Sequence, residues 1–199
     1  MIPGVVLAAG ASSRMGRPKA LLPTDVAGET FLTRIIRTLR EAEVDDVVVV
    51  MGKDADAIRQ AVQGDLAPRL IENPEPEAGQ LSSLLVALRA VDHPGVRGML
   101  VALVDVPLVS AETVRAVLAA YRRSGAPVVR PVSGGRHGHP VIFDRAVFAE
   151  LRCADPHIGA KAVVRAHQAA AVDVEVEDAG AFADVDTQAD YDRIIGRRS

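Results

Sequence analysis

The sequence predicts an α/β protein of three layers, in which helices flank a mostly parallel sheet. Short apolar runs rich in valine alternate with segments of helical periodicity, as they do in βαβ units. Hydrophobic residues make up 49% of the chain and aromatic residues only 3%, so the core must consist of Val, Leu, Ala and Ile. Such a core suits strands that are buried on both faces.

The first half of the chain carries a regular alternation of strands and helices. Strands are expected at residues 5–7, 47–51, 68–72 and 99–104. Helices are expected at residues 31–41, 55–62, 81–91 and 111–122. The run at 47–51 is continuously apolar, which is typical of a strand covered on both faces. Ser110 precedes the last of these helices and is expected to cap it.

The second half is less regular and predicts a mixed sheet. Strands at 127–131 and 140–143 are expected around a polar, glycine-rich turn at 133–138, with helices at 146–151 and 159–167. Residues 172–176 alternate Val with Asp and Glu, which predicts an edge or one-sided strand. A final helix is expected at 189–195. No linker interrupts the chain, so a single domain over residues 1–199 is expected.

Composition excludes several classes of protein. A net charge of −3 argues against a nucleic-acid partner bound by bulk electrostatics. No apolar run reaches the length of about 20 residues that a membrane span needs, and the N-terminus lacks the cationic region of a signal peptide. The single cysteine, Cys153, cannot form an intrachain disulfide and suits a packing or surface role. We therefore expect a cytoplasmic protein with no membrane partner.

Residues 5–22, VVLAAGASSRMGRPKALL, are the stretch around which the chain is organised. Small side chains after the first strand allow backbone N–H groups to face an anion, and Arg14, Arg17 and Lys19 would neutralise its charge. The order of residues matches neither G-x-x-x-x-G-K-[ST] nor G-x-G-x-x-G. A bare G-x-x-x-R-x-G pattern is as readily an ordinary strand-to-helix turn with solvated cations.

The full run resembles the signature L-A-A-G-x-S-x-R-M-G-x-P-K of nucleotidyltransferases with the glycosyltransferase-A type fold. Among them it is most similar to the MobA-like NTP transferases, and within these to the molybdenum cofactor cytidylyltransferases. The resemblance implies a Rossmann-like, mostly parallel sheet and transfer of NMP from an NTP to a phosphorylated acceptor, with release of pyrophosphate. It implies catalytic roles for Arg14, Lys19 and Asp105. It implies nucleotide contacts at Leu7, Ala8, Ala9, Gly10, Arg14, Lys19, Asn73, Gly79 and Ser83.

Acidic residues at two places suggest a metal site. Asp105 follows a buried strand in L-V-D-V-P-L, where a carboxylate without a partner is costly to bury, although a strand-end Asp caps a turn as often as it binds metal. The resemblance implies that Asp105 and Asp186 hold Mg²⁺, a cation that completes its shell with phosphate oxygens and water. Two such carboxylates would raise each other's pKa without a cation. Taken alone, Asp186 or Thr187 suits a helix cap.

Two polar stretches are open to a structural and a functional interpretation. Residues 78–84 read as a helix that begins with a serine cap, but the resemblance places Ser83 against the base of the nucleotide. His137 and His139 lie two residues apart in G-R-H-G-H-P, without a Cys or acid at zinc-ligand spacing, and suit a polar hairpin. The resemblance implies that His139 contacts the acceptor. Residues 155–161 resemble the family's G-D-x-G-A-R with different spacing and Lys161 in place of Arg, which leaves the acceptor open.

The sequence predicts a direct displacement, because no serine has a matched base and Cys153 lies outside every motif. Ala9 occurs where guanylyltransferase relatives carry Gly, so CTP is expected over GTP. The expected acceptor is molybdopterin or the molybdenum cofactor, with transient contact to a molybdoenzyme or its chaperone. Two alternatives remain: a non-catalytic nucleotide- or cofactor-binding chaperone, and an enzyme of the same fold that acts on a sugar phosphate or methylerythritol phosphate.

Overall fold

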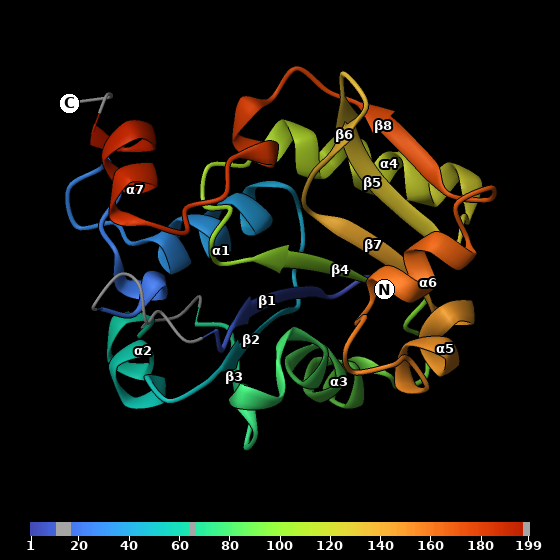
Figure 1. Cartoon of the computed structure of the whole chain (residues 1–199), viewed down its shortest axis with the longest axis horizontal. Helices are drawn as coiled ribbons and strands as arrows, with labels where there is room; N and C mark the ends of the chain where they lie inside the picture. The colour runs from blue at the N-terminus through green and yellow to red at the C-terminus, as the bar shows by residue number, and fades with distance from the viewer. Residues whose placement is uncertain (11–16, 64–66, 197–199) are drawn as a thin grey trace.

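The computed structural model describes residues 1–10, 17–63 and 67–196. Its centre is an eight-stranded sheet with the order β3-β2-β1-β4-β7-β5-β6, and β8 pairs with β5 (Figure 1). The strands are β1 Gly4–Ala8, β2 Val47–Met51, β3 Arg69–Glu72, β4 Gly98–Leu103, β5 Val128–Ser133, β6 Arg136–His137, β7 Val141–Asp144 and β8 Val172–Glu175.

The sheet has a parallel half and a mixed half. Strands β3, β2, β1 and β4 are parallel, β7 is antiparallel to β4, and β5 is antiparallel to β7. Val129 of β5 pairs with Ile142 of β7 on one edge and with Val172 of β8 on the other. Strand β8 is therefore at the edge, as its alternating sequence predicts. The predicted fold class, a mostly parallel α/β sheet of Rossmann-like type, is confirmed.

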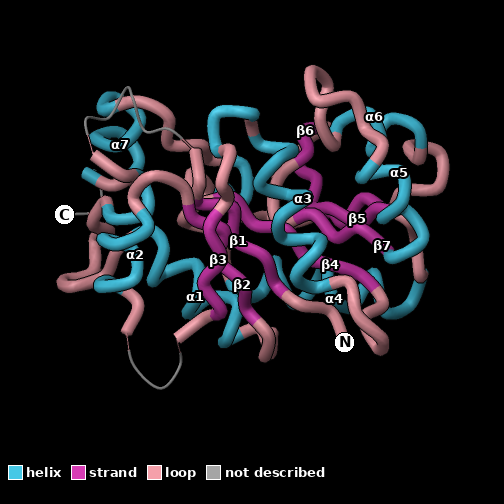
Figure 2. Tube along the Cα trace, turned by 90° about the horizontal axis from the view of Figure 1, so that it is seen from below, coloured by secondary structure: helices cyan, strands magenta, loops and turns pink. Residues whose placement is uncertain are grey.

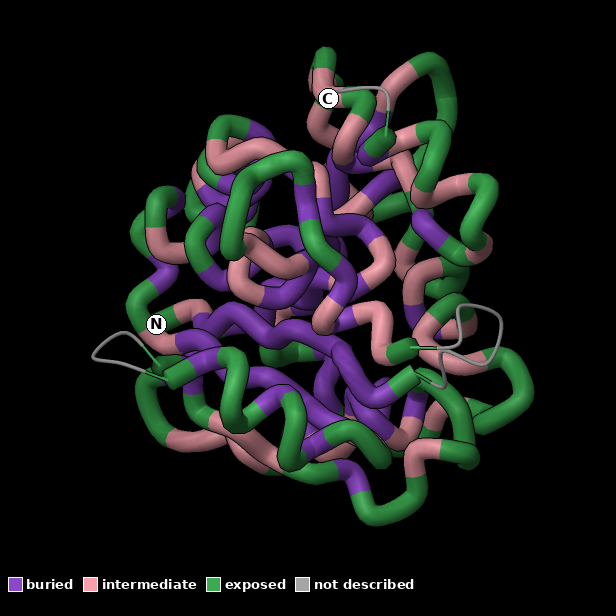
Figure 3. Tube along the Cα trace, turned by 90° about the vertical axis from the view of Figure 1, so that its left-hand side faces the viewer, coloured by how far each residue is buried: buried purple, intermediate pink, exposed green. Residues whose placement is uncertain are grey.

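Helices cover both faces of the sheet, so that the strands run between helical layers (Figure 2). One apolar cluster joins the sheet to α1 Phe31–Glu41, α2 Ala55–Ala61 and α4 Ala111–Ser124. A second cluster joins the other face to α3 Gln80–Val91, α5 Phe148–Arg152 and α6 Lys161–Ala166. Successive strand residues alternate between the clusters, since Val5 belongs to the second and Val6 to the first. The central strands β1, β2 and β4 are accordingly among the most deeply buried parts of the chain (Figure 3), whereas β3, β6 and β8 are partly exposed.

Most predicted elements begin and end within one or two residues of the observed ones, and α1 and β2 match at both ends. The Ser110 side chain accepts a hydrogen bond from the Thr113 N–H and caps α4, as predicted. Helix α6 begins later than predicted, at Lys161, because residues 156–160 form turns. The predicted turn at 133–138 contains the two-residue strand β6. No helix within the described residues is both long and apolar enough to cross a membrane.

The C-terminal segment packs against α1 and against the end of β4. Helix α7, Gln188–Ile194, lies beside the start of α1 (Figure 1), where the Tyr191 ring stacks on Phe31 with 6.0 Å between centroids. The Val185 N–H donates to the carbonyl oxygen of Asp105 at 2.8 Å. This bond fixes the stretch before α7 against the end of β4, and so brings two acidic segments together.

Candidate active site

A pocket of about 220 Å³ lies at the carboxyl ends of β1 and β4, and we call it the rim pocket. In open α/β sheets this edge is where ligands bind. The rim pocket is lined by Leu7, Ala9, Gly10, Lys19, Pro76, Gly79, Gln80, Ser83, Leu103, Val104 and Asp105. The structure thus brings together most residues that the sequence analysis connects with the nucleotide.

Two of the predicted nucleotide residues lie outside the rim pocket, and a third is not described by the structure. Ala8 is buried in the cluster beneath α1 and lies outside the pocket lining. Asn73 is also buried and outside the lining. Arg14 lies outside the described residues. Pro76, Gln80 and Val104 line the pocket without being singled out by the sequence analysis, and no sequence signal distinguishes them from their neighbours.

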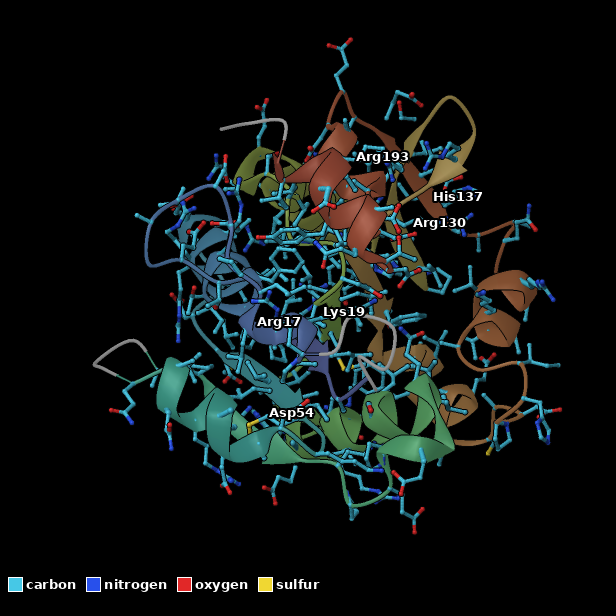
Figure 4. All side chains as sticks on the ribbon, turned by 60° about the vertical axis from the view of Figure 1, so that its left-hand side comes forward. Arg17, Lys19, Asp54, Arg130, His137 and Arg193 are labelled. Atoms are coloured by element: carbon cyan, nitrogen blue, oxygen red, sulfur yellow. The ribbon has the colours of Figure 1, made fainter. Side chains whose placement is uncertain are left out.

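Lys19, which is labelled in Figure 4, lies between two carboxylates at one end of the rim pocket. Its Nζ is 2.6 Å from Oδ1 of Asp186 and 3.8 Å from Oδ2 of Asp105. The solvated cation of an ordinary turn, which the bare pattern would equally allow, is not what the structure shows for Lys19. Lys19 opens a short 3-10 helix, Lys19–Leu21, and its side chain is only 15% exposed. Its ammonium group is held in place by Asp105, just after β4, and by Asp186 in the distant C-terminal segment.

The carboxyl group of Asp105 has a raised pKa. Burial is the largest cause, and the charges of Asp184 and Asp186 add to it, while Lys19 acts in the opposite direction. The expected repulsion between carboxylates is thus present, but burial outweighs it. Oδ1 of Asp105 is buried and has no hydrogen-bond partner among the described residues.

These oxygens fit a hard divalent cation. An orphaned buried carboxylate oxygen beside a second carboxylate is a donor set of the kind that Mg²⁺ or Mn²⁺ accepts. Within the described part of the chain, no group of three or more His, Cys, Asp or Glu residues is placed to hold a metal. A cation here would therefore need further ligands from a bound nucleotide or water.

Asp186 does not cap the helix that follows it. The Thr187 side chain accepts a hydrogen bond from the Asp190 N–H, and Asp190 accepts one from the Thr187 N–H, which forms a complete capping box. The cap interpretation therefore holds for Thr187 and fails for Asp186. The carboxylate of Asp186 is instead directed at Lys19.

Asn73 supports the pocket wall from behind. Its Nδ2 donates to Oγ of Ser82 at 2.6 Å and to Oγ of Ser83 at 3.0 Å, and its Oδ1 accepts from the Glu75 N–H. Gly79 occupies the N-cap position of helix α3 with a φ of +93°, which favours glycine, so the expected serine cap is absent. Ser82 instead donates back to carbonyl oxygens of the preceding turn. Asn73 thus fixes Ser83, which lines the pocket.

A second pocket of about 610 Å³, the distal pocket, shares Leu7, Gln80 and Leu103 with the rim pocket. The predicted acceptor residue His139 lines the distal pocket and does not line the rim pocket. Its Nδ1 is buried without a partner among the described residues, and burial lowers the pKa of the ring. Residues 156–161, the segment with the altered family pattern, also line this pocket.

The distal pocket also contains Arg130, whose interaction with Asp173 the sequence does not predict. Arg130 on β5 donates through Nε to Oδ1 of Asp173 at 2.8 Å, and Nε2 of His137 lies 3.1 Å from the other oxygen. His137 and His139 thus have separate surroundings, and a shared zinc site is not formed. The available signal was weak: Arg130 is the one charged residue of β5, and Asp173 is one of two acids in the alternating strand β8.

Comparison with known proteins gives the family. Residues 4–172 match the model of the MobA-like NTP transferase domain. A probable molybdenum cofactor guanylyltransferase of Rhodopirellula baltica is 36% identical over 126 residues, which are 63% of this chain and only 58% of that protein. The nicotine blue oxidoreductase of Paenarthrobacter nicotinovorans is 35% identical over 153 residues, 72% of this chain and 71% of that protein.

Solved structures agree with this assignment. The crystal structure of Rv0371c from Mycobacterium tuberculosis H37Rv has a TM-score of 0.83 and 32% identity, and covers 98% of each chain. A further structure of Rv0371c is a complex with manganese, with a TM-score of 0.76 and 30% identity over 98% of each chain. With the family model spanning most of its length, this chain belongs to the MobA-like NTP transferase family.

Proposed function

We propose that this chain transfers NMP from an NTP, with CTP preferred, to a phosphorylated acceptor, with molybdopterin or the molybdenum cofactor preferred. The observation that carries the proposal is the convergence of Lys19, Asp105 and Asp186 at one end of the rim pocket. A cation and two acids at this place suit a triphosphate and a divalent metal better than they suit an uncharged ligand. Family membership supports the same reaction class.

The reaction is a direct displacement. An oxygen of the acceptor's phosphate forms a bond to the α-phosphorus of the NTP, and the bond from that phosphorus to the pyrophosphate oxygen breaks. The protein forms no covalent bond to either substrate. Its contribution is to align the NTP with the acceptor phosphate and to stabilise the negative charge of the transition state. Lys19 would hold the triphosphate, and Arg14, from the same sequence motif, would share this task.

Asp105 and Asp186 would hold Mg²⁺. When bound, the metal supplies positive charge to the phosphate oxygens and to the leaving pyrophosphate. The buried Oδ1 of Asp105 supports this role because such an oxygen is costly to leave unpaired. Lys19 would then be released from Asp186 to contact phosphate.

Ala9 is the basis of the proposed preference for CTP. Its backbone is tightly packed, since a Cβ added at Gly52 would lie 2.7 Å from the Ala9 carbonyl oxygen. Its methyl group therefore has a fixed position in the rim pocket and favours the smaller pyrimidine base. A methyl group discriminates by about 1–3 kcal/mol. Because the relative from Rhodopirellula baltica is named a guanylyltransferase, a direct competition between CTP and GTP is needed.

The test is a screen of the four NTPs against molybdopterin, the molybdenum cofactor and sugar phosphates, with pyrophosphate release as the measurement. We expect release with CTP and molybdopterin or its molybdenum form, and an Ala9→Gly variant should shift the preference toward GTP. Release only with a sugar phosphate would replace the acceptor in the proposal. Nucleotide binding without pyrophosphate release from any pair would instead indicate a carrier, such as a chaperone of a molybdoenzyme.

A further inference from the structure

The distal pocket is lined by positive charge, although the chain as a whole has a net negative charge. The chain has 26 acidic and 23 Lys or Arg residues, yet the charged residues that line this pocket are Arg130, Lys161 and Arg165. No Asp or Glu is among the described residues of its lining. Lys161 and Arg165 are both exposed on α6 and form no ion pair with a described residue. The pocket is therefore built for an anion.

Arg130 is the centre of this cationic group. It is 9% exposed, and its Nε is held by Asp173, the residue directly opposite it in the pairing of β5 with β8. The two terminal amino groups of Arg130 make no hydrogen bond with a described residue, and the side chain lines the pocket. Figure 4 shows Arg130 and His137 close together on the side of Lys19 where β5 and β6 lie. A guanidinium held at Nε presents its two terminal nitrogens in a fixed orientation, which suits an oxyanion.

The remaining surface of the pocket is apolar. Leu81, Leu84, Val101 and Phe143 contribute to its lining, and Leu7 and Leu103 connect it to the rim pocket. A ligand that spans the two pockets would therefore have an apolar or ring-shaped body between its ends.

We propose that Arg130, with Lys161 and Arg165, binds a second anionic group of the acceptor, away from the phosphate that reacts. This inference rests on the proposed function and names the acceptor class: a molecule with a phosphate at one end, an oxyanion at the other and an apolar body between them. Asp173 and His137 are positioning residues, because they hold Arg130 rather than the ligand.

The test measures anion binding directly by calorimetry, with the rim pocket saturated by Mg²⁺ and α,β-methylene-CTP. Inorganic phosphate and molybdate are the probes, since both are tetrahedral oxyanions, and the tighter one identifies which oxyanion the site prefers. Arg130→Gln should weaken binding of the tighter probe by about tenfold or more, and Arg130→Lys by about threefold, because lysine lacks the forked geometry. The control Arg69→Gln removes an exposed arginine paired with Asp46 outside both pockets and should change affinity by less than about twofold.

A second variant avoids any change in the core. Lys161→Gln combined with Arg165→Gln alters only exposed residues of α6 and should also weaken probe binding, by about fivefold. In turnover assays with the molybdenum cofactor, whose molybdenum oxo group supplies the second anion, Arg130→Gln should raise the KM of the acceptor while the KM of CTP and kcat stay near wild type. Wild-type probe affinity in both variants, or an equal loss in Arg69→Gln, would overturn the inference. If the CTP analogue fails to bind, the proposed function fails, while the probe titration still reports on Arg130.

Discussion

Lys19 lies between Asp105, which follows β4, and Asp186, which precedes α7. Removing its charge leaves two carboxylates close together, and the pKa of Asp105 would rise further because Lys19 opposes the effect of burial. The residue therefore contributes to the electrostatics of the metal-free site as well as to the proposed contact with phosphate.

We expect Lys19→Ala to reduce turnover by about a hundredfold or more, the usual effect of losing one group that stabilises transition-state charge. The metal-free variant should also lose some thermal stability, and Mg²⁺ should restore it by neutralising the two acids. Pyrophosphate release and melting curves with and without Mg²⁺ measure both effects. Lys53→Ala is the control, since Lys53 is exposed and lines neither pocket. Wild-type turnover in Lys19→Ala would remove this residue from the mechanism.

Asp186 provides the second prediction at this scale. Asp186→Ala and Asp105→Ala should both abolish turnover, and any residual activity should require more Mg²⁺. Asp186→Asn should be milder than Asp105→Asn, because an amide oxygen still coordinates a cation and Asp186 is the more exposed of the two, at 52% against 30%. A Mg²⁺ titration of turnover for the four variants measures this. If Asp186→Ala keeps the wild-type metal dependence, the site with two carboxylates is wrong.

Leu7, Ala9, Gly10, Lys19, Gly79, Ser83 and Asp105 of the rim pocket were predictable because they belong to short contiguous motifs, whereas Pro76, Gln80, Leu103 and Val104 were not. The contacts among the site residues were not predictable either, since Lys19 and Asp186 are 167 residues apart in the chain. The pairing of Arg130 with Asp173 depends on the register of β5 with β8, which no local pattern determines. Asn73 follows a predicted strand, but its role behind Ser83 depends on where α3 begins.

At the scale of elements, the helix α7 places Asp186. The capping box of Thr187 and Asp190 sets the residue at which α7 begins, directly after Asp186. The existence of α7 was predictable from the sequence Asp-Thr before a helical pattern, and so were α1 and β2, whose apolar periodicity is strong. The short strand β6 and the late start of α6 were missed, because two-residue pairings and turns depend on tertiary contacts.

Thr187→Ala should cost about 1 kcal/mol of stability, as is typical for loss of an N-cap, and should raise the Mg²⁺ concentration needed for half-maximal turnover. Thr30→Ala is a matched control, because Thr30 forms a capping box at the start of α1 and lines neither pocket. It should lose a similar amount of stability without a change in metal dependence. Equal metal dependence in the two variants would show that the start of α7 does not position Asp186.

The same cap gives a prediction on pH. A hydrogen bond from Arg193, followed by one from Thr187, lowers the pKa of Asp190 from 3.8 to about 2. Because the pKa is lower in the folded state, this stabilisation is complete above the unfolded pKa and is lost as the pH falls toward 2. The difference in melting temperature between wild type and Asp190→Asn should therefore shrink between pH 4 and pH 2. A difference that stays constant over this range would contradict the assignment.

At the scale of the whole molecule, the parallel half carries the rim pocket, and the mixed half supplies most of the polar lining of the distal pocket. The C-terminal segment joins the two, since Ala181 accepts a hydrogen bond from the His139 N–H and Val185 donates one to Asp105. A ligand in the rim pocket therefore contacts β1, β4 and α3 at once, and its metal would add the segment before α7. Nucleotide and metal should stabilise the fold as a unit.

We expect Mg²⁺ and CTP at about a hundred times the dissociation constant to stabilise the folded state by about 2.7 kcal/mol. For a chain of this size, that corresponds to an increase of about 5–11 °C in the melting temperature. CTP with EDTA should give a smaller increase, because Lys19 alone would then offset the triphosphate charge. In Asp105→Asn, Mg²⁺ should not raise the melting temperature beyond the value reached with CTP alone. The control is Asp46→Asn, at the opposite end of the sheet, in which Mg²⁺ should raise the melting temperature as much as in wild type. If Mg²⁺ adds the same increment to Asp105→Asn as to wild type, the metal is held by the nucleotide alone and Asp105 is not its ligand.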